Sequence, residues 1–398
     1  MSTSIVRPFF KFRGVKILNF DVQDSGSLTM VELVPDQRFQ PICSKCYNTA
    51  NRIHSTEIRL IRDLNLATSN VMIKLHYRKV FCDHCGGIRV EHHDFVEPYR
   101  RITKRLEHYI FALCQLMPLT DVGRLTQLHW HQVKAIDKRG LTRRFSHRTL
   151  SGLKLLCVDE LAVRKGHHYL TIVANHETGE VLYVAEDRNC DSLAKFFKTL
   201  APELLLSIEA IAMDMWDPYI KAVHDFCPHT KIVFDQFHVI KAFHAIIDEV
   251  RNSEYRQSAD SSAYLKNSKY LLLKNAHNLT PAELPRLKAI LRRNKNLATV
   301  YLLKEYLKRL WQYQYVKSAV KFLDYWCQLA QESAIPELKK FVRMLLRYAY
   351  GIVSHCRYPI STARLEGINN KIKVMKRRAY GYHDFDYFKL KIMQATVN

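Results

Sequence analysis

The chain has 398 residues, of which 47% are hydrophobic, and 61 Lys and Arg stand against 38 Asp and Glu, giving a formal net charge of +23. This length predicts several domains, and a positive surplus spread along the chain is typical of proteins that bind a polyanion, with nucleic acid the leading partner. No apolar run approaches the ~20 residues that span a bilayer, and the N-terminus lacks the features of a signal peptide. We therefore expect a cytoplasmic protein with no membrane partner.

Residues 1–98 read as a strand-rich domain that contains two CxxC pairs, Cys43 with Cys46 and Cys82 with Cys85. Two such turns each present two thiolates, the arrangement that closes a tetrahedral, structural Zn²⁺ site. The alternating pattern of the 35 residues between the pairs predicts a hairpin or small sheet that carries the second pair back to the first. The alternative is two reduced dithiols without metal. Nearby histidines could substitute as ligands, but solvent exposure or phosphate contact is the favoured role: His54, His84, His92 and His93.

Residues 99–150 have a helical period and predict a helix-turn-helix DNA-binding domain. Apolar residues recur at the required spacing, at Val122, Leu125, Leu128, Val133 and Ile136. The second helix of such a motif lies in the major groove, which assigns DNA contacts to His131, Gln132, Lys134, Lys138 and Arg139. Gln127 stands where the turn usually has glycine, so a plain helical linker remains the alternative.

Residues 151–240 predict five strands, with two hairpins followed by two strand-helix units, in the order of a ribonuclease-H-like mixed sheet. Three of the apolar runs end on acids, at Asp159, Asp214 and Asp235. In this sheet the first and fourth strands are neighbours, so Asp159 and Asp214 are expected side by side. Glu160 points to the opposite face because side chains alternate along a strand. Asp235 is the rival of Asp214 for the second acidic position.

Two carboxylates held close together repel each other, and a hard divalent cation such as Mg²⁺ or Mn²⁺ relieves that repulsion. Residues 351–398 supply a third acid, Glu366, on a final long helix whose buried stripe is Leu365, Ile368, Ile372 and Met375. Polar residues spaced at three and four follow Glu366 along another face. We assign DNA contacts on this helix to Arg364, Asn370, Lys373 and Arg377.

Residues 241–350 predict an all-helical insertion between the fifth strand and the last helix. Its basic residues are candidates for phosphate contacts: Arg251, Arg292, Arg293 and Lys295. Trp311 and Trp326 are candidates for stacking on a splayed base, although most aromatic residues of a helical domain lie in its core.

Taken together, these motifs resemble the ISL3 family of bacterial insertion-sequence transposases. The resemblance is carried by the CxxC pairs, the helix-turn-helix and the stretches CVDELAVRKGHHYLTIV, AMDMWDPY, FDQFH and STARLEGINNKIKVMKRRAYGY. It implies a DDE enzyme with a ribonuclease-H-like core in which Asp159, Asp214 and Glu366 form the triad. It also implies that Asp235 and His238 are the Asp/Cys-x-x-His element that follows the fifth strand. His238 then either orients the scissile phosphate, pins the sheet edge or is an ordinary core histidine.

The expected protein is thus a multidomain α/β transposase that acts on double-stranded DNA, both terminal inverted repeats and target DNA. We expect it on the bacterial nucleoid, as a homodimer or higher oligomer on DNA. The expected domains are 1–98, 99–150, 151–240, 241–350 and 351–398. The alternatives are a DNA-binding regulator that has lost catalysis and, less favoured, a junction-resolving nuclease.

Overall fold

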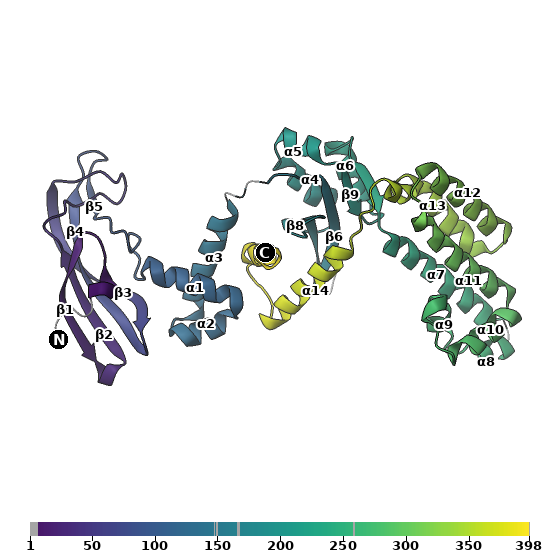
Figure 1. Cartoon of the computed structure of the whole chain (residues 1–398), viewed down its shortest axis with the longest axis horizontal. Helices are drawn as coiled ribbons and strands as arrows, with labels where there is room; N and C mark the ends of the chain where they lie inside the picture. The colour runs from purple at the N-terminus through teal and green to yellow at the C-terminus, as the bar shows by residue number, and fades with distance from the viewer. Residues whose placement is uncertain (1–6, 147, 149, 165–167, 258, 398) are drawn as a thin grey trace. The chain divides into compact units, whose positions relative to one another are not determined.

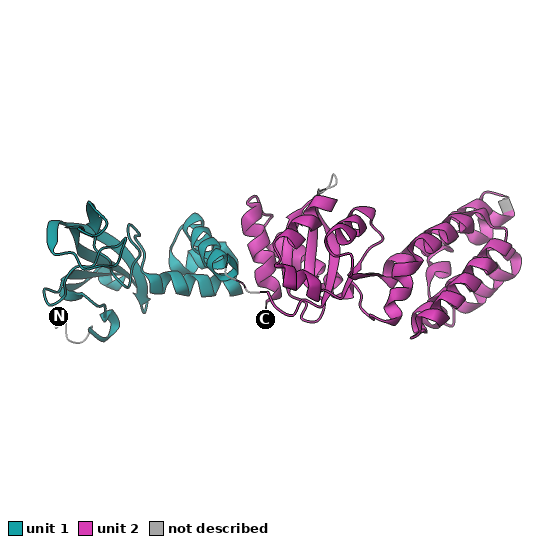
Figure 2. Cartoon of the chain, turned by 90° about the horizontal axis from the view of Figure 1, so that it is seen from above, with its two compact units in different colours: residues 1–146 teal, residues 147–398 magenta. Residues whose placement is uncertain are grey.

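The computed structural model of the chain describes residues 7–146, 148, 150–164, 168–257 and 259–397. The chain divides into two compact units, Met1–Ser146 and His147–Asn398 (Figure 2). Among the described residues, no helix has the length and apolar character needed to cross a membrane. Short 3-10 helices occur at Arg7–Phe10, Asp24–Gly26, Ala276–Asn278, Lys308–Gln312 and Ser354–Cys356.

The first unit begins with a five-stranded sheet. Its strands are β1 (Val15–Gln23), β2 (Leu28–Pro35), β3 (Arg52–Leu66), β4 (Ser69–Phe81) and β5 (Ile88–Val90). The order is β1-β2-β4-β3, with β5 paired to β4. Alternate residues of β2 and β4 are buried, as the period of two predicts. The long β3-β4 hairpin lies between the two CxxC pairs, which confirms the expected connection.

Three helices complete this unit: α1 (Lys104–Leu116), α2 (Leu119–Thr126) and α3 (Trp130–Ser146). The Thr103 side chain caps α1 by accepting a hydrogen bond from the backbone of Leu106. Gln127 ends α2 with a φ of 56°, so the turn has the left-handed residue that the motif requires although it is not glycine. The apolar face is buried as predicted at Val122, Val133 and Ile136, but Leu125 is 53% exposed.

The second unit is built on a mixed sheet of β6 (Leu155–Arg164), β7 (His168–Asn175), β8 (Val181–Glu186), β9 (Ala210–Met213) and β10 (Lys231–Phe234). Its order is β10-β9-β6-β7-β8. β7 pairs antiparallel with β6 and β8, whereas β9 pairs parallel with β6 and β10. This is the ribonuclease-H-like order expected from the sequence, with the first and fourth strands adjacent.

Helices cover both faces of this sheet. One face packs against α4 (Cys190–Lys198), α5 (Pro202–Ser207) and α6 (Asp217–Phe226). The other packs against α14 (Ala363–Arg378) and α15 (Phe385–Thr396), and α14 lies beside β6 (Figure 1). The expectation of a single closing helix is wrong, because Tyr380 and Gly381 both take positive φ values and break the helix after Arg378.

The insertion consists of seven α-helices in the described part of the chain. They are α7 (Gln236–Tyr255), α8 (Ala259–Leu265), α9 (Lys269–Leu273), α10 (Glu283–Arg293), α11 (Lys295–Leu307), α12 (Val316–Glu332) and α13 (Pro336–Val353). Its core is continuous with the α4-α6 face of the sheet. Gly351 of α13 packs so closely on Phe234 of β10 that an added Cβ would lie 2.5 Å from the ring. Trp326 is fully buried and its Nε1 donates to the Leu303 carbonyl oxygen, so it is a core residue and not a stacking surface.

Candidate active site

Asp159 and Asp214 lie level with each other on neighbouring strands. β6 and β9 run parallel with Cys157 opposite Ala212, and the same register two residues on places Asp159 opposite Asp214. Residues of this parity on both strands are buried under α14 and α15, so both aspartates belong to that face of the sheet. The predicted pairing of the two acids is therefore a direct consequence of the strand order.

The Asp159 carboxylate is held by two donors. Its Oδ1 accepts from the backbone N–H of Glu160 at 2.8 Å, and its Oδ2 accepts from Nδ2 of Asn369 at 2.7 Å. Burial and the negative charge of Asp214 both disfavour ionisation, and together they raise the pKa of Asp159 to about 6. The site thus holds two acids that repel each other in a poorly solvated position.

His238 provides the positive partner of Asp214. Its Nε2 lies 2.7 Å from Oδ1 of Asp214, and both side chains are 24% exposed. Burial alone would lower the pKa of His238, but the Asp214 carboxylate outweighs burial and the pKa is raised. The contact with Asp214 is one that the sequence did not predict for His238.

Both oxygens of the Asp235 carboxylate accept hydrogen bonds that stabilise the fold. It is the N-cap of α7, where Oδ1 accepts from the backbone N–H of Phe237 at 2.6 Å. Its Oδ2 accepts from both the backbone N–H and the hydroxyl of Thr362, at 2.6 and 2.7 Å. The side chain is 5% exposed. This carboxylate joins the end of β10 to the start of α14.

Glu366 is on the first turn of α14 and is exposed. The stripe predicted for this helix is confirmed, with Leu365 and Ile372 buried and Ile368 and Met375 packed beside them. Among the described residues, only four cysteines form a group of three or more His, Cys, Asp and Glu side chains placed to share a metal ion. Asp159, Asp214 and Glu366 do not form such a group in the described part of the chain.

Sequence reasoning missed Asn369, which is buried against Asp159, and selected its exposed neighbour Asn370. Both asparagines lie about one turn from Glu366, so the spacing does not separate them. Glu160 points to the opposite face as predicted, where its carboxylate pairs with Arg188 at 2.9 Å. Arg188 in turn lies over the rings of Tyr169 and Trp216.

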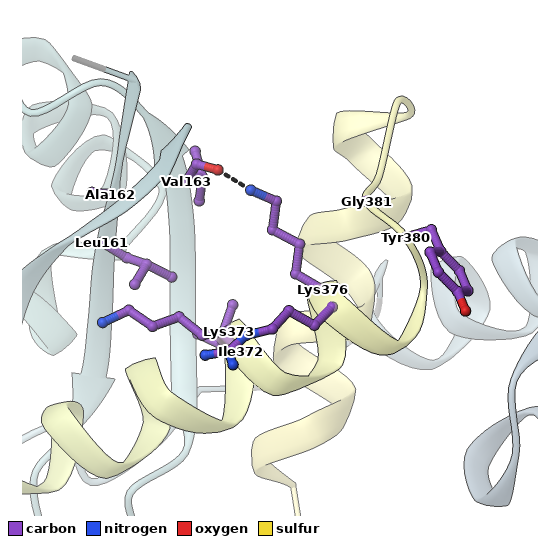
Figure 3. A pocket seen from close by; sticks show the side chains of 9 residues that line it. Leu161, Ala162, Val163, Ile372, Lys373, Lys376, Tyr380 and Gly381 are labelled. Carbon is purple, nitrogen blue, oxygen red and sulfur yellow. Dashed lines mark hydrogen bonds between the residues drawn. The ribbon is translucent and has the colours of Figure 1, made fainter. Parts of the chain in front are cut away.

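A basic pocket of about 360 Å³ lies between the end of β6 and the second half of α14 (Figure 3). Leu161 and Val163 of β6 line one wall, and Lys373, Lys376 and Arg377 of α14 line the other. Lys376 donates to the Val163 carbonyl oxygen, which fastens the helix to the strand. Lys373 and Arg377 are exposed, as a DNA-binding role requires, and so is Asn370. Arg364, also exposed, donates to the Glu177 carbonyl oxygen.

The basic residues selected in the insertion differ in their surroundings. Arg292, Arg293 and Lys295 are exposed around the junction of α10 and α11. Arg251 is half-buried and bonded to Asp248 and Asn252. Trp311 is half-buried, with its ring 6.2 Å from that of His355.

In the helix-turn-helix, the start of α3 is exposed at His131 and Gln132. Gln132 also accepts a hydrogen bond from the backbone N–H of His129, which helps to begin the helix. Lys134 and Lys138 are half-buried. Arg139 donates to Glu107 of α1 at 2.6 Å and so packs the helices together.

The four predicted cysteines come together in the first unit. The sulfur atoms of Cys43 and Cys85 lie 3.7 Å apart, and those of Cys46 and Cys82 lie 3.5 Å apart. All four sulfur atoms lie within 4.8 Å of one another. Zn–S bonds of ~2.3 Å in a tetrahedron require sulfur separations of about 3.8 Å, so the cluster fits a structural zinc ion. The backbone N–H of Cys85 lowers the pKa of the Cys82 thiol, whereas burial raises the pKa of the Cys85 thiol.

Comparisons with known proteins match all three regions. Residues 156–392 match the model of the DDE transposase domain of ISL3 type. Residues 91–141 match the helix-turn-helix domain of transposase family ISL3. Residues 40–85 match the zinc finger of the IS204/IS1001/IS1096/IS1165 transposases. The transposase for IS1001 of Bordetella parapertussis is 36% identical over 94% of this chain and 93% of its own length. The transposase for IS1557 of Mycobacterium tuberculosis is 23% identical over 92% of this chain and 89% of its own length.

Proposed function

Since the chain belongs to the ISL3 family of transposases, we propose that it cuts DNA at the terminal inverted repeats of its insertion sequence and joins the freed ends to target DNA. As a member of this family it is a DNA-cleaving and DNA-transferring enzyme with a DNA-binding helix-turn-helix. The proposal assigns catalysis to Asp159, Asp214 and Glu366, with a divalent cation, Mg²⁺ or Mn²⁺, as cofactor.

The observation that carries this proposal is the pairing of Asp159 with Asp214. Their strands place them level on one face, and the charge of Asp214 helps to raise the pKa of Asp159 to about 6. A pair of carboxylates under mutual repulsion offers the hard oxygen ligands that Mg²⁺ prefers. When bound, Mg²⁺ would activate a water or DNA hydroxyl and stabilise the leaving oxygen of the phosphodiester. Glu366 would complete the ligand set from α14.

Asp214 suits the second position better than Asp235 does. Three N–H and O–H donors already occupy the Asp235 carboxylate, which is almost fully buried. Asp214 is more exposed and is paired with His238, whose raised pKa keeps a proton near it. In this assignment His238 offsets the charge of Asp214 before the cation is bound and limits its rotation.

DNA is held by surfaces in both units. His131 and Gln132 read the terminal repeat from α3, and Lys134 and Lys138 contact phosphates nearby. Asn370, Lys373 and Arg377 hold the strand that leads away from Glu366, with Arg364 at the start of the helix. The exposed cations of α10 and α11 contact flanking DNA. Two ends must meet for joining, so we propose a dimer or higher oligomer on the bacterial nucleoid.

The test is cleavage of a DNA fragment that contains one element end, with the zinc-loaded full chain and Mg²⁺. Alanine variants of Asp159, Asp214 and Glu366 should bind the fragment with unchanged affinity and lose cleavage by at least ~10³-fold. Cysteine variants of Asp214 and Asp235 separate the rival acids. Mn²⁺ accepts a thiolate ligand more readily than Mg²⁺ does, so Mn²⁺ should restore cleavage to Asp214→Cys and not to Asp235→Cys.

Wild-type protein that binds the fragment and never cuts it would identify a DNA-binding regulator and refute the proposal. Restoration of Asp235→Cys alone would move the second ligand from Asp214 to Asp235. Sequencing the DNA on either side of the gene supplies the fragment, because inverted repeats that bound the reading frame are the natural substrate.

A further inference from the structure

The side-chain amide of Asn369 has a hydrogen-bond partner for its nitrogen but none for its oxygen in the described part of the chain. The side chain lies on α14, one helical turn after Glu366, and is 7% exposed. Its Nδ2 donates to Oδ2 of Asp159 at 2.7 Å. Its Oδ1 is buried and has no hydrogen-bond partner in the described part of the chain. The unused acceptor therefore belongs to the same amide that touches the catalytic aspartate.

The chemistry of the contact fixes which end of the amide is unused. A carboxylate accepts hydrogen bonds, so only the NH₂ group of Asn369 can face Asp159 favourably. Reversing the amide would place its oxygen against the carboxylate oxygen. The buried oxygen is thus left over by necessity, and an unpaired buried acceptor disfavours the fold by roughly 1–3 kcal/mol. Such a group in a native structure points to a missing partner.

We propose that Asn369 is part of the divalent-cation site, an inference that rests on the proposed function. Its Nδ2 orients Asp159, and its Oδ1 is a further hard oxygen for the cation, bound directly or through one of the cation's waters. Amide oxygens are among the ligands that hard divalent cations accept. Hydrogen-bond partners of metal ligands also set ligand orientation and affinity. Asn369 combines both properties, and the three acids remain the charged ligands.

A purely structural role for Asn369 makes a different prediction. In that case the Nδ2 bond only fastens α14 to β6, and the empty acceptor has no function. Removing the side chain would then lower stability and leave the affinity for a divalent cation unchanged. Cation binding measured without DNA and without turnover separates the two explanations.

The experiment is a Mn²⁺ titration of the zinc-loaded full chain, followed by electron paramagnetic resonance of the free ion. Asn369→Ala should bind Mn²⁺ ~10–100-fold more weakly than wild type, the usual effect of losing such a partner. Asn369→Asp keeps the shape and an oxygen but replaces the donor with a second negative charge. It should still bind Mn²⁺ at pH 8, because a carboxylate oxygen is also a hard ligand.

Asn370→Ala is the matched comparison, since it removes the same amide from the exposed neighbouring position. It should weaken DNA binding and leave the Mn²⁺ affinity as in wild type. Thermal melting of each variant shows whether it is folded. If Asn369→Ala does not fold, Asn369→Ser replaces it in the Mn²⁺ titration, and an affinity within about twofold of wild type overturns the inference in the same way.

Two results are decisive and distinct. A Mn²⁺ affinity of Asn369→Ala within about twofold of wild type, with binding lost in Asp159→Ala, overturns this inference and leaves the proposed function intact. Wild-type Mn²⁺ binding by Asp159→Ala contradicts the proposed function itself.

Discussion

Two effects disfavour the ionised form of the Asp159 carboxyl group in the folded protein. Burial and the charge of Asp214 raise its pKa from 3.8 to about 6, and a raised pKa means that the folded protein binds the proton more tightly than the unfolded chain. The proton on Asp159 therefore stabilises the fold at acid pH. This stabilisation is lost as the pH rises through about 6. The proposed cation site would in this way destabilise the fold at neutral pH without a bound cation.

We predict that Asp159→Asn is more stable than wild type at pH 8 without added divalent cation. The pKa difference of about two units corresponds to a gain of at most ~3 kcal/mol in the free energy of unfolding, since one unit is ~1.4 kcal/mol. The gain should be almost lost at pH 3.5, where Asp159 is protonated in the folded state and mostly protonated in the unfolded state. Urea unfolding at the two pH values measures it.

The exposed Asp225 on α6 supplies the control, because Asp225→Asn removes the same charge from a solvated position. A gain for Asp159→Asn that is equal at both pH values would contradict the assignment of the pKa shift to this carboxyl group.

At single residues, the sequence predicts chemistry better than it predicts contacts. Asp159 and Asp214 were found because each ends an apolar run, and the register then brings them level. Asn369 was not found, because the choice between it and Asn370 depends on how α14 is rotated against β6. That rotation is set by tertiary packing. Asp235 also ends an apolar run, and only its three donors show that it serves the fold.

At the scale of elements, α14 is fastened to the sheet at two points that flank Glu366. Thr362 bonds to Asp235 at the end of β10, and Asn369 bonds to Asp159 on β6. Asp235 also caps α7, the first helix of the insertion. One buried carboxylate thus joins the helix that leaves the sheet to the helix that carries the third acid.

We predict that Thr362→Val, which removes only the hydroxyl donor to Asp235, lowers the free energy of unfolding by ~1–3 kcal/mol, as expected for a buried bond to a charged group. DNA cleavage should slow because α14 is held less firmly, whereas binding of the element end should not change. Thr362→Ser keeps the donor and should restore both properties. Urea unfolding and single-turnover cleavage provide the measurements.

The prediction fails if Thr362→Val matches wild type in stability and cleavage, or if Thr362→Ser is as impaired as the valine variant. Either result would show that the hydroxyl bond does not position α14.

Most elements were predictable because their periods are clear and their order is constrained. The five strands of the mixed sheet and the helical insertion follow from short apolar runs separated by helical stretches. The break between α14 and α15 was not predictable. It depends on Tyr380 taking a positive φ next to Gly381, which an apolar pattern does not reveal. The same applies to Gln127, which adopts the left-handed turn position without being glycine.

At the scale of the whole molecule, each unit has its own core. Two apolar clusters lie in the first unit and two others in the second. The first unit joins two regions that the sequence separates at residue 98, because buried Asp63 of β3 bonds to both Thr103 and Arg105 at the start of α1. The zinc-binding sheet and the helix-turn-helix therefore share a stabilising contact.

We predict that the two units unfold as separate transitions, and that removal of zinc affects only the first. A structural zinc ion contributes on the order of 10 kcal/mol to folding, and the four cysteines connect the turn before β3 to the turn after β4, at the open end of the hairpin. Chelation, or Cys82→Ser, should melt the sheet and loosen the helix-turn-helix through Asp63, so binding to the element end is lost. Differential scanning calorimetry of the full chain should show that the second transition keeps its temperature.

Cys190→Ser changes a cysteine of the second unit and is the control, so it should leave the first transition in place. A single transition that shifts as a whole on chelation would show instead that the two cores fold as one.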